Sequence, residues 1–183
     1  MTDVIIVGDG PGGLSAALFL AKNGKTVTVF GQDETAMHYA LLNNYLGISQ
    51  ITGSDFQKIA RKQVQKFGAS LQDQKVTSVE KTGDGFAVTT ENGEQHESKY
   101  LIIAEGKSLR LANSLGLPKT DEGIEVDRNN RTSIPNLYVV GRTARVQRSQ
   151  AIISAGSGAT AALDILATEK GKHFVDYDTV PKE

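Results

Sequence analysis

The sequence contains no cysteine among its 183 residues. That absence excludes disulfide bonds, cysteine–metal sites, thiol nucleophiles and any redox-active dithiol carried by this chain. An excess of either charge is also missing, because 20 Lys and Arg residues face 21 Asp and Glu residues, for a formal net charge of −1. Balanced charge provides no general attraction to nucleic acid or to anionic membranes, and we expect neither as a partner.

Long hydrophobic runs are missing as well. No apolar run approaches the roughly 18 residues that a membrane-spanning helix needs. A strand pattern that begins at about Asp3 leaves no space for a signal peptide, so we expect a cytoplasmic protein. The histidines, His38, His96 and His173, are far apart in the sequence, and we expect no metal site. The length predicts one domain, residues 1–183.

Glycine, in contrast, is abundant, and its first cluster lies in an informative context. The chain has 19 glycines, about a tenth of its residues against roughly 7% in an average protein. The β-branched run 4–7 (VIIV) predicts a strand buried on both faces, and GDGPGG follows at 8–13. Residues 14–23 predict a helix, and residues 26–30 predict a second strand. Together these segments form a βαβ unit.

Three glycines of this cluster, Gly8, Gly10 and Gly13, have the G-x-G-x-x-G spacing of dinucleotide-binding folds. Gly8 permits the sharp turn after the strand, Gly10 leaves room for a pyrophosphate, and Gly13 allows the helix to pack closely on the strands. The N-terminus of the helix then offers free N–H groups and a partial positive charge to phosphates. The alternative is a tight turn without a ligand.

One part of this fingerprint is absent. A carboxylate that binds ribose is expected about 20 residues after the glycines, at the end of the second strand. That position is Gly31, and Gln32, Asp33 and Glu34 follow it. Asp33 and Glu34 are the candidates for the ribose, and the alternative is that both are solvated carboxylates of a loop.

The middle of the chain predicts a small antiparallel β-meander. Alternating patterns over residues 70–81, 86–90 and 95–99 surround the sequences GDG and NG, which favour tight hairpin turns. Before the meander, we expect Ser54 to cap a helix over residues 55–67.

The remaining elements are apolar strands and a last helix, followed by a polar tail. In chain order they are the strand 100–104, a thin connection at 107–121, the strands 123–126 and 137–140, the helix 152–167 and the tail 171–183. The predicted order is therefore a parallel sheet that opens with a βαβ unit, is interrupted by a meander and closes with a strand and a helix.

This order resembles the FAD-binding half of the thioredoxin reductase-like group of flavoproteins with two dinucleotide-binding domains. The matching segments are residues 3–24, NNYLG (43–47), KFGA (66–69), YLIIAEG (100–106), TSIPNLYVVG (132–141) and residues 150–166. The resemblance implies an α/β, Rossmann-like FAD-binding fold with a central parallel sheet, helices on both faces and the meander. It also implies FAD as the cofactor and a homodimer as the assembly.

The resemblance further implies roles for individual residues. The pyrophosphate of FAD would lie on the glycine loop, the adenine edge on the backbone of Val76, and the flavin and ribityl chain near Asn44. Ala104 and Gly106 match the turn that closes over the cofactor, and the helix that begins at Gln150 points at the flavin C2 carbonyl. The full candidate set is Gly8, Gly10, Pro11, Gly12, Gly13, Gly31, Gln32, Asn44, Val76, Ala104, Glu105, Gly106, Gly141, Arg142, Gln150 and Ala151.

The chain departs from the group in several places. It has no Cys-x-x-Cys, so the dithiol relay of thioredoxin reductases is absent from these residues. Only the connection 107–121 stands where the group inserts its NADPH-binding domain. Glu105 replaces the Thr of an Ala-Thr-Gly turn, and Arg142 replaces an Asp that contacts the ribityl chain. These replacements weaken the inference of tight FAD binding.

Arg142, Arg145 and Arg148 follow one another at intervals of three. On a helical turn all three would share one side, which suggests an anion-binding rim beside the flavin. The alternative is a solvated basic loop.

The leading functional hypothesis is an FAD flavoprotein that transfers electrons between its flavin and freely diffusing NAD(P)H or a protein partner. No side chain stands out as a catalytic acid or base. The competing hypothesis is a non-catalytic flavin-binding or redox-sensing module that acts through a partner. A dehydrogenase that binds NAD in a Rossmann fold is a third alternative, which the meander disfavours.

Overall fold

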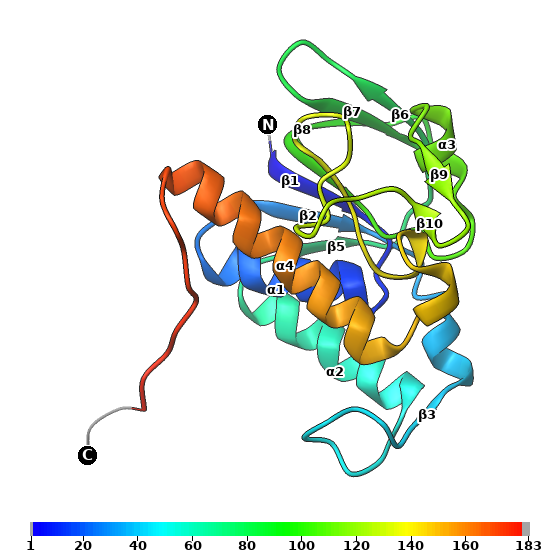
Figure 1. Ribbon diagram of the computed structural model, residues 1–183, viewed down its shortest axis with the longest axis vertical. Helices are drawn as coiled ribbons and strands as arrows, with labels where there is room; N and C mark the ends of the chain where they lie inside the picture. The colour runs from blue at the N-terminus through cyan, green and yellow to red at the C-terminus, as the bar shows by residue number, and fades with distance from the viewer. Residues whose placement is uncertain (1, 181–183) are drawn as a thin grey trace.

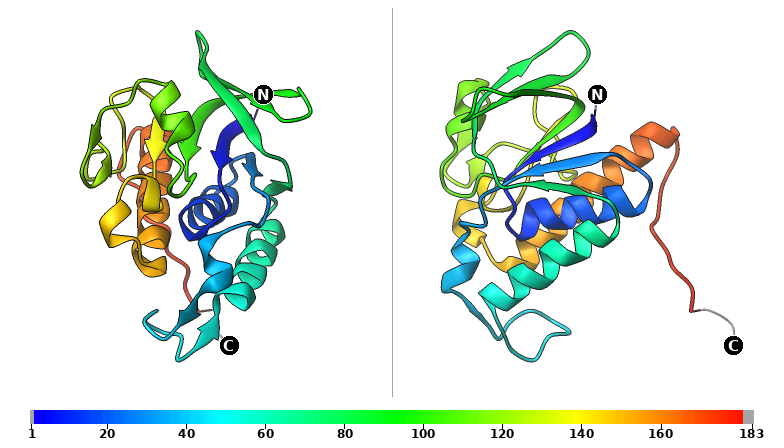
Figure 2. Two further views of the ribbon diagram at one scale, coloured as in Figure 1. Left: turned by 90° about the vertical axis from the view of Figure 1, so that its right-hand side faces the viewer. Right: turned by 180° about the vertical axis from the view of Figure 1, so that it is seen from behind.

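The computed structural model describes residues 2–180, which form three layers with a β-sheet in the middle (Figure 1). The middle layer is a parallel sheet in the order β5 (Ser70–Gln72), β2 (Val27–Phe30), β1 (Thr2–Val7), β8 (Gln95–Ile103) and β11 (Leu137–Val139). One face is covered by α1 (Pro11–Lys22), α2 (Gly53–Lys66) and α4 (Ala151–Lys170), which Figure 2 shows from two sides. The other face is covered by β6 (Val76–Lys81), β7 (Phe86–Thr90) and the short α3 (Arg110–Ser114).

Strand β1 is buried on both faces, which explains why its residues 4–7 are all apolar. Val4 and Ile6 pack into the helix layer, and Ile5 and Val7 pack into the meander layer. All four side chains are buried. A strand that is covered on both faces cannot alternate polar and apolar residues. The predicted α/β fold with a central parallel sheet and a meander is therefore confirmed, with the three long helices on one face and α3 alone on the other.

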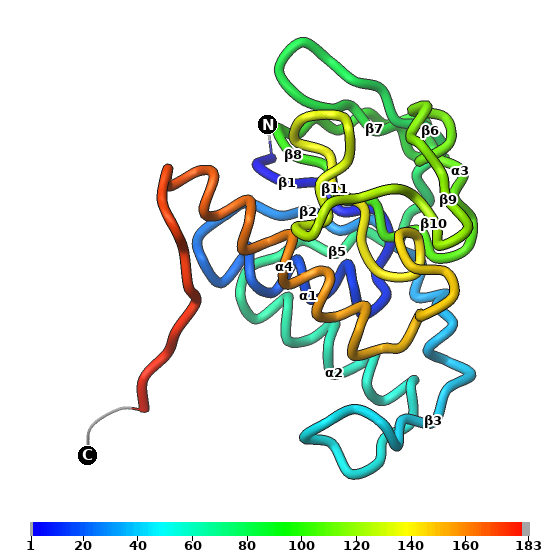
Figure 3. Tube along the Cα trace, viewed as in Figure 1, coloured from blue at the N-terminus to red at the C-terminus, as the bar shows by residue number. Residues whose placement is uncertain are grey.

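Strand β8 takes part in both the meander and the parallel sheet. Its first half, residues 95–98, pairs antiparallel with β7. Its second half, residues 101–103, pairs in parallel with β11, and β1 lies along its other edge. This pairing places β8 between β1 and β11, and Figure 3 labels the three strands near one another. The two segments that the sequence predicted separately, 95–99 and 100–104, are therefore one strand.

Two local predictions are wrong. Residues 70–81 are not one strand of the meander, because β5 pairs in parallel with β2 and only β6 joins the meander. Ser54 does not cap α2, because the helix begins at Gly53, two residues before the predicted start. The cap is Thr52, whose Oγ1 accepts a hydrogen bond from the backbone N–H of Asp55 at 3.1 Å.

Helices α1 and α4 approach each other closely at Gly12 and Gly158, where neither helix has a side chain. A Cβ atom at Gly158 would lie 1.9 Å from the carbonyl oxygen of Gly12, so no larger residue fits there without separating the helices. By length and composition alone, α4 is apolar enough to cross a membrane. Its residues Ala161, Ala162 and Ile165 are fully buried in the core, which is the environment of a central helix in a folded domain.

The predicted connection and tail both have structure. Residues 107–121 contain α3 and β9 (Lys119–Thr120), which pairs with β10 (Gly123–Ile124). In the tail, Phe174 packs against the helix layer and Asp176 contacts Lys22 of α1 at 2.9 Å. Residues 181–183 of the predicted tail lie outside the described residues, and the single-domain boundary 1–183 stays a prediction.

Candidate cofactor-binding site

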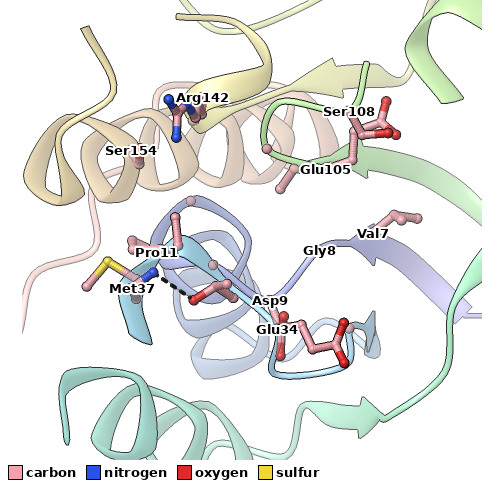
Figure 4. A pocket seen from close by; sticks show the side chains of 18 of the residues that line it. Val7, Gly8, Asp9, Pro11, Glu34, Met37, Glu105, Ser108, Arg142 and Ser154 are labelled. Atoms are coloured by element: carbon pink, nitrogen blue, oxygen red, sulfur yellow. Dashed lines mark hydrogen bonds between the residues drawn. The ribbon is translucent and has the colours of Figure 1, made fainter. Parts of the chain in front are cut away.

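A cavity of about 770 Å³ opens at the carboxyl ends of the parallel strands. Its wall combines the glycine loop after β1, residues after β2, the turn after β8 and the loop after β11 (Figure 4). Ligands bind at this edge of open α/β sheets, because the loops that leave neighbouring strands diverge there. The volume lies within the range of roughly 300–1,000 Å³ of small-molecule and cofactor sites.

The N-terminus of α1 lies at this cavity. Gly10, Pro11 and Gly12 line the wall, and no described side chain caps the first turn. The N–H groups of a first helical turn have no acceptor within the helix, so that of Gly12, which lines the wall, is available to a ligand. A Cβ atom at Gly10 would meet no atom within 4 Å, so the loop faces open space there. These features suit the two negative charges of a pyrophosphate.

Helix α4 begins at the same cavity. Its N-cap Gln150 and first residue Ala151 line the wall, and no side chain among residues 2–180 caps this end either. Asn44 lies outside the wall, but its Nδ2 donates a hydrogen bond of 3.1 Å to Gln150 Oε1. Arg142 also lines the wall, and its buried Nε has no hydrogen-bond partner in the part of the chain that the structure describes. Two positive helix ends and an arginine thus face one cavity.

Another part of the wall contains an acceptor without a donor. The Oε1 of Gln74 is buried, and no group within residues 2–180 donates to it. Two residues after Gln74, the carbonyl of Val76 accepts a hydrogen bond from Arg110 Nη2, and the next carbonyl, that of Thr77, accepts one from Arg110 Nη1, both at 2.6 Å. The backbone of Val76, which the resemblance assigned to the adenine edge, therefore already accepts one hydrogen bond at its carbonyl. Gln74 offers the free acceptor beside it, which a ligand amino group would satisfy.

The glycine loop is joined to α2 by hydrogen bonds and an ion pair to Asp9. Asp9, the second residue of GDGPGG, is 3% exposed and pairs with Arg61 of α2. Arg61 also contacts Asp73 at 2.5 Å, and Gln57 donates to the backbone carbonyl of Asp9 at 2.5 Å. Burial raises the pKa of the Asp9 carboxyl, and the adjacent charge of Arg61 opposes that rise.

Glu105 caps a helix at the edge of the cavity. Its Oε2 accepts a hydrogen bond from the N–H of Leu111 and its Oε1 accepts one from that of Ala112, each at 3.1 Å. These are first-turn N–H groups of α3, and the preceding residue, Leu109, has a left-handed backbone with a φ of 52°. The carboxylate therefore holds the connection 107–121 against the body of the molecule.

The family model of the pyridine nucleotide-disulphide oxidoreductases matches residues 2–108 and 40–159 of this chain. The chain belongs to this family. Within it, the chain is a thioredoxin reductase-like, FAD-binding flavoprotein domain, which confirms the resemblance and the cofactor that the sequence predicted.

Two curated relatives illustrate the match. The thioredoxin reductase of Streptomyces clavuligerus is 37% identical over 124 residues, which is 65% of this chain and 38% of that protein. The bifunctional thioredoxin reductase/thioredoxin of Mycobacterium leprae strain TN is 35% identical over 114 residues, which is 59% of this chain and 24% of that protein. The chain thus spans well under half the length of these relatives.

Solved structures share the fold of this family member. The atypical thioredoxin reductase TRi from Desulfovibrio vulgaris Hildenborough superposes with a TM-score of 0.86 at 19% identity, covering 93% of this chain and 99% of that chain. A ferredoxin-flavin thioredoxin reductase from Clostridium acetobutylicum gives 0.81 at 20% identity, covering 93% and 98%. At these identities the likeness establishes the fold.

The structure brings most of the predicted cofactor-binding residues of this flavoprotein domain to the cavity. Those that line it are Gly8, Gly10, Pro11, Gly12, Gly31, Gln32, Val76, Ala104, Glu105, Gly106, Gly141, Arg142, Gln150 and Ala151. Gly13 and Asn44 do not line it. Gly13 instead packs so closely that a Cβ atom would lie 1.9 Å from the Gly8 carbonyl oxygen. Of the two ribose candidates, Glu34 lines the cavity and Asp33 does not. The contacts of these residues to FAD stay predictions.

The predicted arginine rim does not form. Arg142 lies in the 3₁₀ turn Gly141–Thr143 and lines the cavity, but Arg145 and Arg148 are exposed and do not line it. Arg148, in a second 3₁₀ turn at Val146–Arg148, pairs with Glu122 at 2.5 Å. Two separate turns therefore replace the single helical turn on which the three side chains would share one side.

Three residues at or beside the cavity, Asp9, Gln74 and Arg110, were not predicted from the sequence. Asp9 was visible as the one charged residue inside the glycine motif, whereas nothing in the sequence distinguished the other two. No group of three His, Asp or Glu side chains that could hold a metal ion occurs within the described range 2–180. The uncapped ends of α1 and α4 and the unpaired atoms of Gln74 and Arg142 fit FAD, because the cofactor has phosphates, a base and a ring to place against them.

Proposed function

We propose that this domain binds FAD and passes electrons between the flavin and an external donor or protein partner. The observation that carries the proposal is that the uncapped N-termini of α1 and α4 meet at one cavity in a member of this flavoprotein family. FAD, when bound, supplies the hydride and electron-transfer chemistry, and the protein supplies binding and electrostatics.

The residues of the chain divide this work between them. The backbone N–H groups at the start of α1 bind the pyrophosphate. The N-terminus of α4, at Gln150 and Ala151, favours negative charge on the ring that lies against it, which raises the reduction potential of the flavin. Arg142 adds a formal positive charge to the same wall.

The electron partner is proposed to be external to these residues. The chain carries no cysteine, so no dithiol within it takes electrons from the flavin. The connection 107–121 forms only α3 and β9, at the place where the resemblance puts an NADPH-binding insertion. Freely diffusing NADH or NADPH, or a reduced ferredoxin-type protein, is the class of donor that we propose.

Cofactor identification on the purified protein tests the proposal. We expect a yellow protein that releases FAD on denaturation and whose flavin absorbance is bleached under anaerobic conditions by NADH, NADPH or a reduced ferredoxin. A colourless protein that does not take up added FAD would contradict it. A homodimer, the assembly that the resemblance implies, is checked on the same sample by light scattering.

A non-catalytic redox-sensing module is the second candidate. It is favoured by Glu105, which is engaged in capping α3, and by Arg142, which stands where the related flavoproteins have an Asp. The two functions differ in one result. A protein that retains FAD but whose flavin none of the three donors reduces would support the sensing module over the reductase.

A further inference from the structure

Gly31, the residue directly after strand β2, has no side chain, and the side chain of Asp9 fills the space beside it. A Cβ atom at Gly31 would lie 2.3 Å from Cγ and 2.5 Å from Oδ1 of Asp9. The carboxyl group of Asp9 therefore occupies the volume into which a side chain at position 31 would project. In the dinucleotide-binding fingerprint, this is the place of the carboxylate that binds a ribose.

The two oxygens of this carboxylate have different surroundings. Oδ2 pairs with Arg61 and accepts a hydrogen bond from the backbone N–H of Asp33 at 3.1 Å. Within the described range, the hydrogen bonds that other residues donate to this carboxyl group both go to Oδ2. Asp9 lines the cavity in the loop directly after Gly8, as Figure 4 shows. One oxygen is thus anchored to the protein and the other is left for a ligand.

Arg61 holds this group in place. It contacts both Asp9 and the exposed Asp73 and does not line the cavity, so the guanidinium fixes the orientation of the Asp9 carboxyl without occupying the site. The positive charge of Arg61 also opposes the rise in the Asp9 pKa that burial causes, which favours the ionised acceptor.

We propose that Asp9 is the ribose-binding carboxylate of this protein, presented from the glycine loop rather than from the end of β2. The inference rests on the proposed FAD site and adds its adenosine-ribose subsite. Oδ1 accepts hydrogen bonds from the ribose hydroxyls, and its negative charge disfavours dinucleotides that carry a 2′-phosphate. Asp33 then contributes only a backbone N–H, and Glu34 is a peripheral residue of the wall.

Competition between nucleotides tests this assignment without measuring activity. ADP and 2′,3′-dideoxy-ADP are titrated into the FAD-free protein by calorimetry. We expect the native protein to prefer ADP by about tenfold or more, because a hydroxyl that donates to a carboxylate contributes about 1.5–3 kcal/mol. In Asp9→Ser the preference falls to within about threefold. In Asp9→Gly/Gly31→Glu, which removes the Asp9 Cβ atom that would lie 2.6 Å from a Cβ atom at position 31 and restores a carboxylate at the end of β2, the preference returns.

Asp73→Asn is the matched control. It removes the other carboxylate on Arg61, yet Asp73 is exposed and does not line the cavity, so the preference for ADP should persist. Equal affinity of the native protein for both nucleotides would overturn the inference, whether or not the variants fold. A loss in Asp73→Asn as large as in Asp9→Ser would also overturn it, because the effect would then be structural. Native protein that binds FAD but ignores the ribose hydroxyls refutes only this subsite, whereas native protein that binds neither FAD nor ADP refutes the proposed function as well.

Discussion

The α-helices within residues 2–180 differ in whether a side chain caps their N-terminus. The starts of α2 and α3 are capped by side chains, by Thr52 and Glu105. The starts of α1 and α4 have no side-chain cap among the described residues, and both line the cavity. At an uncapped helix end that faces solvent, a bound ligand adds little stability, because water already satisfies the free N–H groups. The two uncapped ends at one cavity therefore have N–H donors that a bound ligand could satisfy, which is the basis of the proposed FAD site, whereas the N–H donors of the capped ends are already satisfied by the protein.

The largest effect is expected at the glycines that shape the α1 terminus. Gly13→Ala should destabilise the protein by about 3 kcal/mol and abolish FAD binding, because its Cβ atom would lie 1.9 Å from the Gly8 carbonyl oxygen. Gly10→Ala is the matched variant, since its Cβ atom meets nothing within 4 Å. It should keep the native stability and lose FAD affinity alone. Urea unfolding and fluorescence titration with FAD separate the two. Equal unfolding midpoints for both variants would contradict the distinction.

At the capped α3 terminus, removal of the cap should affect stability and not the ligand. Glu105→Ala leaves the N–H groups of Leu111 and Ala112 without acceptors, so we expect a loss of about 2 kcal/mol in the free energy of unfolding. FAD affinity should change by less than about threefold. The exposed Glu125 gives a control, and Glu125→Ala should be neutral within about 0.5 kcal/mol. A large loss of FAD affinity with intact stability would instead make Glu105 a ligand-binding residue.

Beside the α4 terminus, Arg142 should act on the ligand. Arg142→Gln removes a charge from the cavity wall, and we expect FAD to bind about tenfold more weakly, with a smaller dependence on salt concentration. The reduction potential of the bound flavin should fall, because negative charge on the ring is less stabilised. Arg145→Gln, at an exposed position outside the wall, is the control and should change neither quantity. Equal responses of the two variants would indicate a general surface-charge effect.

The smallest effect is expected at the C-terminal end of α4, where Glu169 forms ion pairs with Lys25 and Lys99. Hydrogen bonds from Lys99, Lys25 and Tyr100 lower the pKa of Glu169 to about 2, from an ordinary value of 4.5. A carboxyl whose pKa is lower in the folded state stabilises the fold above pH 4.5 and loses that contribution as the pH falls towards 2. Because the group is partly solvated, we expect the contribution to be about 1 kcal/mol. Thermal unfolding of native protein and Glu169→Gln between about pH 6 and pH 2.5 should show the difference shrinking with acid, and a constant difference would argue against it.

Local patterns in the sequence were enough to predict the fold. The run VIIV, the spaced glycines and the hairpin turns each act within a few residues, and their order predicted the parallel sheet and the meander. The family that this order resembles then supplied most of the candidate site residues, and all of the candidates except Gly13 and Asn44 line the cavity. Residues 70–81 were misread because β5 and β6 follow one another in a single alternating pattern. Their different pairing depends on β2, which is remote in sequence.

Interactions across the fold were beyond sequence reasoning. The cap that Glu105 gives to α3 depends on where residues 107–112 turn back. The position of the Asp9 carboxyl depends on the absence of a side chain at Gly31, which the sequence shows only as a missing acid. The three arginines have regular spacing, but spacing predicts a shared side only where the backbone is a continuous helix, and here it is broken into two turns.

The contact between Gly12 and Gly158 has a consequence for how this protein diverges in sequence. Near its N-terminus α1 meets α4 main chain against main chain, because no side chain stands at Gly12 or at Gly158, the eighth residue of α4. Replacements on the outer faces of α1 and α4 can therefore accumulate without disturbing this contact. A chain only 19% identical to a solved structure can therefore keep the same fold, whereas a single added methyl group at Gly158 would force α1 and α4 apart.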